Sequence, residues 1–352
     1  MSDQGAQDRH AARKLVSLVV PMYNEAQALD ALFARLMQVL EPLQARYRFE
    51  VVCVNDGSRD ATLETLIRKS RELPVLRVVD LSRNFGKEAA LSAGIGEARG
   101  DAVIPLDADL QDPPELIVQM LEKWEDGAEV VLAHRVNRDT DGFLKRLTAK
   151  YFYRVHNALS EPTIPENVGD FRLMDRRVVD VLLSLPESRR FMKGLFAWVG
   201  FRTESVGYER RERSAGSTKF SGWKLWNLAL EGITSFSTVP LRAWTYFGGA
   251  VALLALVYGL LLVTRTLLFG ADLPGYASLM TAVLFLGGVQ LIGIGVLGEY
   301  VGRIYVESKR RPAFVVRGRY AEGAEVEHDR IRTPVSHIDK AMTAMPPRPS
   351  TK

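Results

Sequence analysis

The sequence predicts an α/β domain built on a mostly parallel sheet, followed by two helices long enough to cross a membrane. Short apolar runs alternate with helical patterns from Lys14 to about Leu132. Near-continuous Val-rich strands that alternate with helices are typical of a parallel sheet covered on both faces. Further along, Ala243–Thr264 and Leu273–Gly298 contain no Asp, Glu, Lys or Arg. Each stretch exceeds the roughly 20 residues that a helix needs to span a bilayer.

Five apolar runs predict the strands of the sheet. They are Leu15–Val20, Phe49–Val54, Val75–Leu81, Asp101–Leu106 and Ala128–Ala133. Between the first two runs, apolar residues recur at helical spacing over Glu25–Leu40, which predicts an amphipathic helix that stops near Pro42. Cys53, the only cysteine, lies inside the second run and is expected to be a buried structural thiol.

The segment before the first apolar stretch predicts a helix that lies in the membrane interface. A basic stretch, Arg210–Lys219, leads into Gly222–Ser237, where Trp223 and Trp226 share one helical face with apolar residues. An ordinary helix packed on the soluble domain is the alternative. Two tryptophans just before a span favour the interfacial position.

The distribution of positive charge predicts the orientation of the two spans. Val301–Tyr320 holds six Lys and Arg residues, whereas the turn Arg265–Asp272 carries one Arg and one Asp. Because positive charge near span ends marks the cytoplasmic side, the large N-terminal part and the tail are both expected in the cytoplasm, on the inner membrane. Small residues at Gly288, Gly295 and Gly302 predict close helix packing within the hairpin or between subunits.

The charge balance bears on a possible nucleic-acid partner. The chain has 46 Lys and Arg against 42 Asp and Glu, a net charge of +4. Such a small, evenly spread excess does not indicate a nucleic-acid partner.

Polar turns follow three of the predicted strands. They are Pro21–Glu25, Asn55–Ser58 and Asp107–Pro114. Each turn has an ordinary explanation by itself, since Asp, Asn and Gly favour turns and caps. Parallel strands end at the same edge of a sheet, however, and ligands of such sheets bind beyond these carboxyl ends. The three turns are therefore expected to converge on one site.

The pair Asp107 and Asp109 predicts a divalent-cation site. A second Asp-x-Asp, Asp139 and Asp141, lies in a polar loop and is expected to be only solvated. The position after a buried strand distinguishes the first pair from the second. Mg²⁺ or Mn²⁺ binds one or two carboxylates and completes its shell with phosphate oxygens and water. This chemistry suits the departure of a phosphate-bearing leaving group.

Four motifs in combination resemble those of glycosyltransferase family 2, whose members have the GT-A fold. They are Val19–Glu25, Val54–Ser58, Ser82–Lys87 and Leu106–Pro114. With the two C-terminal spans, the chain resembles the polyprenyl-phosphate glycosyltransferase branch, which includes dolichol-phosphate mannose synthase and the bactoprenol glucosyl transferases. The resemblance covers Lys14–Tyr320 and implies a GT-A sheet, an interfacial helix and two transmembrane helices.

The resemblance also implies roles for individual residues. Those expected to bind the nucleotide sugar are Pro21, Tyr23, Glu25, Asp56, Lys87, Asp107 and Arg135. Those expected to hold Mg²⁺ or Mn²⁺ are Asp107, Asp109 and Gln111. Those expected to be catalytic are Asp109, Asp170, Arg213 and Lys219. Those expected to bind the acceptor phosphate are Arg138, Arg213, Ser217 and Lys219. Alternatively, Arg135 and Arg138 are solvated cations in a loop and bind no phosphate.

The implied reaction is transfer of a sugar from a nucleotide sugar to undecaprenyl phosphate at the cytoplasmic membrane face. The donor that the resemblance favours most is UDP-glucose. The reaction is metal-assisted and inverting, and it yields a lipid-phosphate-linked sugar for modification of cell-envelope glycans such as O-antigen. Alternative donors are a UDP-aminoarabinose derivative, a UDP-N-acetylhexosamine and GDP-mannose. Related enzymes also suggest a homo-oligomer.

Two other functions compete with this one. Processive polysaccharide synthases resemble the N-terminal half, but they carry a Gln-x-x-Arg-Trp motif, which this sequence lacks. A non-catalytic membrane scaffold that binds nucleotide sugars is the second, because a fold does not dictate function. The presence of Asp107, Asp109 and Gln111 disfavours the scaffold.

The sequence divides into five predicted parts. They are a disordered N-terminus (1–13), a GT-A catalytic domain (14–205), a basic loop with the interfacial helix (206–241), a transmembrane hairpin (242–300) and a basic cytoplasmic tail (301–352) that is disordered after about residue 321.

Overall fold

The computed structural model describes residues 13–136, 165, 168–187, 190–208, 237–269 and 275–326. They belong to two compact units. The first unit contains the sheet, its helices and the chain from Pro312 onward. The second unit contains two long helices that lie between these parts in the sequence.

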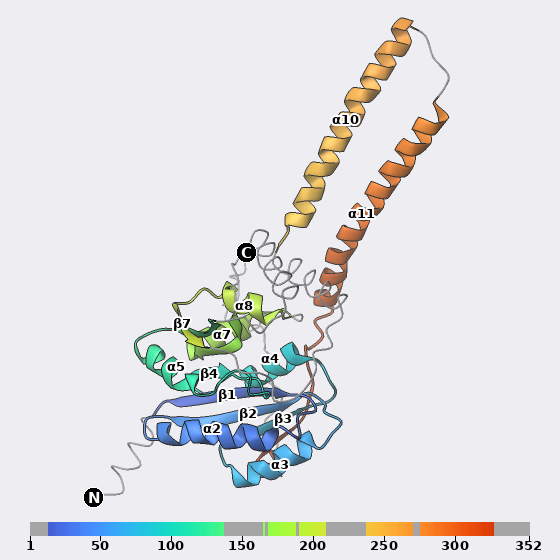
Figure 1. Ribbon diagram of the computed structural model, residues 1–352. Helices are drawn as coiled ribbons and strands as arrows, with labels where there is room; N and C mark the ends of the chain where they lie inside the picture. The colour runs from blue at the N-terminus through green and yellow to red at the C-terminus, as the bar shows by residue number, and fades with distance from the viewer. Residues whose placement is uncertain are drawn as a thin grey trace, which may run out of the picture. The chain divides into compact units, whose positions relative to one another are not determined.

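The first unit is built on one mixed sheet, shown in Figure 1. Its strands are β1 (Leu15–Met22), β2 (Arg48–Asn55), β3 (Leu76–Leu81), β4 (Ala102–Pro105), β5 (Val130–Arg135), β6 (Val168–Asp175), β7 (Thr203–Tyr208), β8 (Val316–Ala321) and β9 (Ala324–Glu325). They lie in the order β7-β5-β6-β4-β1-β2-β3-β8-β9. The central strands β4, β1, β2 and β3 are parallel, whereas β6 pairs antiparallel with β4 and β8 pairs antiparallel with β3.

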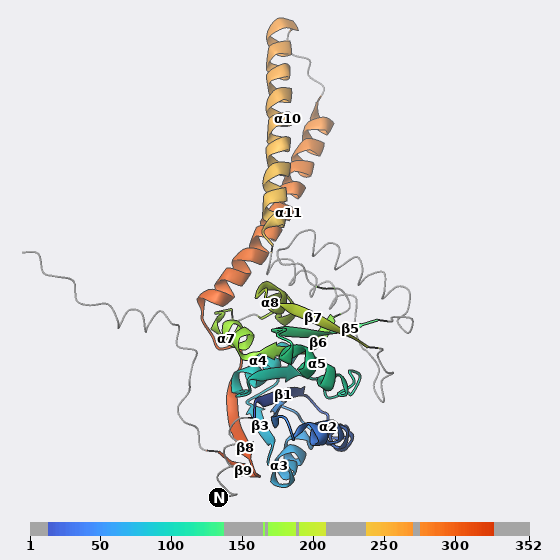
Figure 2. The same cartoon turned by 90° about the vertical axis from the view of Figure 1, so that its left-hand side faces the viewer.

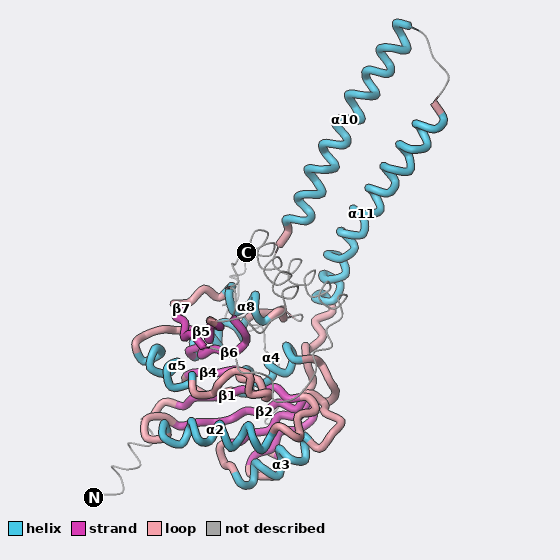
Figure 3. Tube along the Cα trace, viewed as in Figure 1, coloured by secondary structure: helices cyan, strands magenta, loops and turns pink. Residues whose placement is uncertain are grey.

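Helices cover both faces of the sheet. Their bounds are α2 (Leu29–Leu43), α3 (Thr62–Glu72), α4 (Lys87–Glu97), α5 (Leu116–Glu125), α7 (Arg176–Ser184) and α8 (Met192–Trp198). Residues of α2, α3 and α5 share one buried cluster with Val16, Leu18 and Val20 of β1. On the other face, α4 packs so closely that a Cβ at Gly94 would lie 2.3 Å from Val19 Cγ1. Figure 3 shows the strands gathered between these helices.

The local sequence explains why these elements form. The five apolar runs become β1 to β5, with bounds that shift by at most two residues. Their side chains are buried on both faces of the sheet, which favours Val, Ile and Leu at successive positions. The first helix ends at Leu43 with Pro42 in its last turn. Cys53 is fully buried, as predicted, and burial raises the pKa of its thiol.

The strands β8 and β9 differ from what the sequence predicts. The pattern of Val316–Ala321 indicates a basic tail in which order ends near residue 321. The structure instead pairs β8 with β3 and continues to β9, as Figure 2 shows at the edge of the sheet. Arg317 and Arg319 interrupt the apolar pattern of β8. Charged side chains of this kind are common near the edge of a sheet, where only the two-residue β9 lies outside β8, and they break the apolar pattern by which a strand is recognised.

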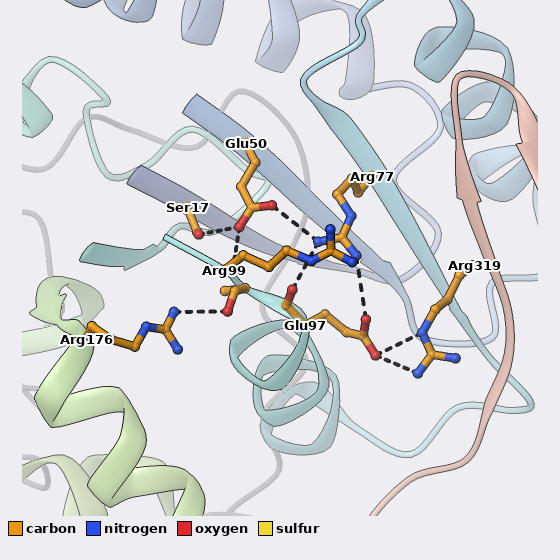
Figure 4. A network of polar contacts seen from close by, with 8 residues as sticks. Ser17, Glu50, Arg77, Glu97, Arg99, Arg176 and Arg319 are labelled. Carbon is orange, nitrogen blue, oxygen red and sulfur yellow. Dashed lines mark hydrogen bonds and ion pairs between the residues drawn. The ribbon is translucent and has the colours of Figure 1, made fainter. Parts of the chain in front are cut away.

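Charged and polar side chains around the buried Glu50 connect the strands at the amino edge of the sheet (Figure 4). Glu50 of β2 accepts hydrogen bonds from Ser17 Oγ at 2.5 Å and from the Arg99 N–H at 2.6 Å. Its other oxygen lies 3.2 Å from Arg77 Nη1. Arg319 of β8 donates to the Glu97 carboxylate at 2.9 and 2.5 Å. This network fixes the end of the sheet that is farthest from the predicted site.

The second unit consists of α10 (Val239–Phe269) and α11 (Tyr276–Ser308). Both are long and apolar enough to cross a membrane, and 0% and 6% of their most apolar windows are buried inside the protein. This exposure distinguishes them from core helices. The helices pack closely at Gly293, where a Cβ would lie 1.9 Å from Trp244 Nε1. The predicted glycines behave differently, because Gly288, Gly295 and Gly302 have no neighbour within 4 Å of an added Cβ.

The predicted part boundaries shift where the structure describes them. The strand β7 continues to Tyr208, past the predicted boundary of the catalytic domain at 205. The helix α11 continues to Ser308, past the predicted end of the hairpin at 300. The predicted interfacial helix, within residues 206–241, falls on positions that lie mainly outside the described residues.

Candidate active site

The carboxyl edge of the parallel strands collects the polar turns that the sequence predicts to converge. Turns after β1, β2, β3 and β4 all reach this edge, because the four strands run in the same direction. The strand β6 runs the opposite way, so its first residues, including Asp170, reach the same edge. Antiparallel insertion of β6 therefore brings a residue from far along the chain to the site.

Asp56 fastens the turn after β2 to the turn after β3. Its carboxylate is buried and accepts backbone N–H bonds from Phe85 at 2.7 Å and from Gly86 at 2.9 Å. Burial raises the pKa of Asp56, and the two N–H donors partly offset this rise. A carboxylate held this firmly fixes the two turns relative to each other.

The turn after β1 docks on the turn after β2. The Asn24 N–H donates to Ser58 Oγ at 3.0 Å, and Asn24 Oδ1 accepts from the Arg59 N–H at 2.8 Å. Asn24 has a positive φ of 57°, a conformation that costs energy for any residue with a Cβ. Beside it, the Glu25 N–H donates to Thr62 Oγ1 at 2.9 Å, and Tyr23 is exposed. Pro21 lies near the end of β1.

Lys87 joins two of the predicted acidic residues. Its ammonium nitrogen lies 2.8 Å from an oxygen of Asp107 and 2.8 Å from Asp170 Oδ2. Burial alone would lower the pKa of Lys87, but the two carboxylates outweigh it and raise the pKa. Burial likewise raises the pKa of Asp107, whereas for Asp170 the nearby cations, Lys87 first, outweigh burial and lower the pKa. Both carboxylates therefore share one cation.

One oxygen of Asp170 is available to a ligand. Asp170 Oδ1 is buried and has no hydrogen-bond partner among the described residues, while Oδ2 is held by Lys87. A buried acceptor without a partner is costly, and such atoms in native proteins commonly serve a ligand. The position suits a hydroxyl donor, such as that of a sugar.

The turn after β4 presents the predicted metal-binding residues. Asp107 and Asp109 are both partly exposed at the carboxyl edge, and Asp109 Oδ1 accepts the Gln111 N–H at 3.1 Å. Leu110, which lies between Asp109 and Gln111, has a positive φ of 54°, so the turn is strained. Gln111 Nε2 is buried and lacks a partner among the residues described, which suits a donor to a phosphate oxygen.

These residues fit a divalent cation that is shared with a substrate. No group of three His, Cys, Asp or Glu side chains that could hold a metal ion is found in the described part of the chain. Mg²⁺ and Mn²⁺ with nucleotides need only one or two carboxylates plus phosphate oxygens. Asp107 and Asp109 supply two hard oxygen donors on one short turn, and this donor set suits either ion.

Arg135 is held in a separate cluster at the same edge. Its Nε donates to Tyr208 Oη at 3.0 Å, and its Nη2 lies 3.9 Å from Asp112 Oδ1. The Tyr208 hydroxyl also donates to Asp112, and burial together with this carboxylate raises the pKa of Tyr208 to about 12. The turn after β4 is thereby tied to β5 and β7.

Two charged residues near Asp170, the buried Arg172 and the partly exposed Glu88, are not predicted from the sequence. Arg172 is buried, donates to the Gly169 carbonyl at 2.7 Å and lies 4.0 Å from the Phe196 ring centroid. Burial lowers the pKa of Arg172 to about 10. Burial and the charge of Asp170 raise the pKa of Glu88 to about 7. In the sequence, Arg172 is noticeable because it is a charged residue within the apolar run that follows Asp170.

Replacing Glu88 with glutamine is expected to raise the melting temperature at pH 8 and to leave it nearly unchanged at pH 4. The folded state binds the Glu88 proton more tightly than a free glutamate does, whose pKa is 4.5. The stability of the natural protein therefore falls as the pH rises from about 4.5 through 7. Glutamine removes this contribution. Thermal unfolding of the variant, beside Glu122→Gln at an exposed position, measures it, and parallel pH profiles would contradict the prediction.

Four predicted residues cannot be compared with the site. They lie outside the described residues: Arg138, Arg213, Ser217 and Lys219. Their predicted roles in binding the acceptor phosphate stay predictions.

The fold and the acidic turns together define a GT-A glycosyltransferase domain, and comparison with known proteins identifies the family. Residues 17–183 match the model of glycosyl transferase family 2, and residues 239–304 match that of the GtrB C-terminal hairpin. The chain belongs to glycosyltransferase family 2 and is a hexosyltransferase.

Two curated relatives resemble nearly the whole chain. The bactoprenol glucosyl transferase of Shigella phage SfV is 55% identical over 304 residues, which cover 86% of this chain and 98% of the relative. The prophage bactoprenol glucosyl transferase homolog of Escherichia coli K12 is 53% identical over 302 residues, with the same coverage. Among solved structures, the mannosyltransferase PcManGT of Pyrobaculum calidifontis, in complex with GDP-Man and Mn²⁺, is 18% identical, with a TM-score of 0.42 over 84% of this chain and 87% of that one.

Proposed function

We propose that this protein transfers one hexose, with UDP-glucose as the donor, to a polyprenyl phosphate in the membrane. The observation that carries the proposal is the assembly of Asp56, Lys87, Asp107 and Asp170 at one sheet edge, in a chain more than half identical to bactoprenol glucosyl transferases. The two long apolar helices, α10 and α11, support a lipid-soluble acceptor, since they can anchor the enzyme in the membrane.

The reaction requires two anionic groups to approach each other. An oxygen of the acceptor phosphate attacks the anomeric carbon, and the bond from this carbon to the donor diphosphate breaks. UDP leaves, and the new bond forms on the opposite face, which inverts the configuration. A phosphate monoester is largely dianionic at neutral pH, because its second pKa is about 6. It therefore needs little help from a general base.

The residues of the site are assigned by their positions. Asp56 holds the turns around the nucleotide, and Asp170 accepts a sugar hydroxyl through Oδ1. Lys87 compensates the carboxylates and lies where it can also contact the donor diphosphate. Asp107 and Asp109 would hold Mg²⁺ or Mn²⁺ together with this diphosphate, and the ion would neutralise charge on the leaving group. Fixed cations of this kind act most strongly where water is excluded.

The order of the elements supports a cytoplasmic location on the inner membrane for both ends of the catalytic unit. The strands β3 and β8 pair directly, and the two candidate spans lie between them in the sequence. Paired strands occupy the same side of a membrane, so the chain crosses an even number of times. Basic residues after α11 favour the cytoplasm for this side.

Cysteine labelling tests this topology. In intact bacterial cells, a membrane-impermeant maleimide should label Asp272→Cys, between the spans, and should label Val326→Cys only after permeabilisation. Val326 is 49% exposed, so accessibility of its side chain does not limit the reaction. Cys53 is buried and provides an internal background control. Labelling of Val326→Cys from outside intact cells would contradict the topology.

The donor is tested with the purified full-length protein in detergent. Undecaprenyl phosphate is incubated with labelled UDP-glucose, a UDP-aminoarabinose derivative, UDP-N-acetylglucosamine or GDP-mannose, each with Mg²⁺, Mn²⁺ or a chelator. The proposal expects label in the lipid fraction from UDP-glucose and a divalent ion only. Transfer from another donor would correct the sugar. Transfer in the presence of the chelator would show that the reaction needs no divalent ion. Size-exclusion chromatography of the same sample tests the predicted homo-oligomer.

A further inference from the structure

The strand β8, which lies between β3 and the two-residue edge strand β9, contacts the rest of the sheet through two arginines with different surroundings. Arg317 lies beside the carboxyl end of β3, because β8 runs antiparallel to β3. Its Nε is 2.8 Å from Asp80 Oδ2. Arg319 lies farther along and pairs with Glu97, in the network at the amino edge (Figure 4). The two arginines lie two residues apart on one strand and pair with different carboxylates, Asp80 and Glu97.

Asp80 is a buried carboxylate whose two oxygens have different partners. Its side chain is 1% exposed, and Arg317 holds Oδ2. Oδ1 accepts a hydrogen bond from Asn55 Nδ2 at 2.7 Å. A buried carboxylate needs both a compensating charge and hydrogen bonds, and removal of one partner leaves an uncompensated charge. Arg317, whose side chain is 57% exposed, supplies the compensating charge for the buried Asp80.

Asn55 connects Asp80 to the turns of the candidate site. Its Oδ1 accepts the Ser58 N–H at 3.3 Å, and Ser58 Oγ accepts the Asn24 N–H at 3.0 Å. Asn55 also directly precedes Asp56 in the chain. Hydrogen bonds therefore lead from Arg317 through Asp80 and Asn55 to the turns after β2 and β1.

A second contact of the same segment reaches the turn after β3. The Ser82 N–H donates to the Val315 carbonyl at 2.9 Å, and Arg317 Nη2 donates to the Leu81 carbonyl at 3.3 Å. This turn continues to Phe85 and Gly86, which donate to Asp56. The segment that follows the membrane helices in the sequence thus supports the nucleotide pocket from two directions.

We propose that Arg317 is a positioning residue of the donor site, which acts through Asp80 and Asn55 on the shape of the nucleotide pocket. Arg317 itself touches neither nucleotide nor sugar. It compensates the buried Asp80, which keeps Asn55 in place and the Asn55–Ser58 turn in its binding conformation. This inference rests on the proposed function in one respect only: the pocket binds a nucleoside diphosphate.

The test compares three variants of the full-length protein in detergent: Arg317→Ala, Arg317→Lys and Arg319→Ala. The dissociation constant for UDP, the donor KM, kcat and the melting temperature are measured for each. Arg317→Ala is expected to weaken UDP binding and to raise the donor KM by about tenfold, with kcat changed less than about threefold. Lysine retains the charge and should recover most of the affinity.

Arg319→Ala is the matched control. It removes an arginine from the same strand, but its partner Glu97 belongs to the network at the other edge. We expect a lower melting temperature with UDP affinity within about twofold of the natural protein. A general weakening of β8 predicts instead that both alanine variants lose affinity equally, and this result would overturn the proposal.

A double-mutant cycle separates the charge of Asp80 from the packing of β8. Asp80→Asn keeps an acceptor for Asn55 and removes the buried charge, so Arg317→Ala should have little further effect in this background. An equal loss in both backgrounds would overturn the proposed path. If the natural protein binds UDP but transfers no sugar, this result contradicts the proposed function, whereas the UDP affinities of the variants still test the role of Arg317. Natural protein that binds neither UDP nor GDP contradicts both.

Discussion

Replacing Asp109 with alanine is expected to abolish sugar transfer while the protein stays folded. Asp109 lies on the strained turn after β4, together with Asp107 and Gln111, and its Oδ1 accepts the Gln111 N–H. Alanine removes one of two hard oxygen donors from the proposed cation site. Loss of a group that stabilises developing charge in the transition state typically lowers turnover by about a hundredfold or more. Initial rates with a saturating divalent ion measure this loss.

The sequence offers a matched control for this substitution. Asp141 belongs to the second Asp-x-Asp, which is predicted to be only solvated. Asp141→Ala should leave turnover within about twofold of the natural protein, because exposed substitutions away from a site have small effects. Equal melting temperatures for both variants would show that the loss is chemical. Normal turnover of Asp109→Ala would show that this turn does not hold a metal ion that the reaction needs.

Replacing Gly57 with alanine is expected to disrupt the nucleotide pocket. Gly57 follows Asp56, has a φ of +62°, and approaches the turn after β3 so closely that a Cβ would lie 2.4 Å from the Arg83 carbonyl carbon. No real Cβ tolerates such a contact with backbone, so one turn must move. Movement separates Asp56 from the N–H groups of Phe85 and Gly86. We expect UDP affinity to fall by at least about tenfold, together with a lower melting temperature.

Gly127 provides the control for backbone strain alone. It also has a positive φ, of +93°, but a Cβ there would meet only the flexible end of Arg202, at 3.4 Å. Gly127→Ala should therefore destabilise the fold by about 1–2 kcal/mol without weakening UDP binding. UDP titrations and thermal unfolding of the two variants separate these effects. Unchanged affinity in Gly57→Ala would show that the contact between the two turns is not part of the pocket.

Local patterns predict the parallel half of the fold well. The runs that become β1 to β5 are recognisable because strands buried on both faces need apolar residues throughout. The turns that end them are recognisable because Asp, Asn and Gly gather there, and parallel strands place these turns at one edge. Local sequence and the direction of the strands are therefore enough to assign Asp56, Asp107 and Asp109 to one site.

Long-range pairing cannot be predicted in the same way. The contact between Lys87 and Asp170 depends on β6 running antiparallel between β4 and β5, which no local pattern specifies. The arginines of β8 break its apolar pattern, which conceals both the strand and the pairing of Arg317 with Asp80. The helices pack at Gly293 rather than at Gly288, Gly295 and Gly302, and this choice likewise depends on where Trp244 of the facing helix lies.

Mass spectrometry of the lipid product distinguishes transfer of a single hexose from the competing functions. The purified full-length protein is incubated with undecaprenyl phosphate, UDP-glucose and Mg²⁺ or Mn²⁺, and the lipid is extracted. We predict one species that carries a single hexose on the retained phosphate, absent with chelator and absent with Asp109→Ala. A ladder of longer products would indicate a processive synthase. Unmodified lipid with every donor, from folded protein that binds UDP, would contradict the account and indicate a nucleotide-sugar-binding scaffold.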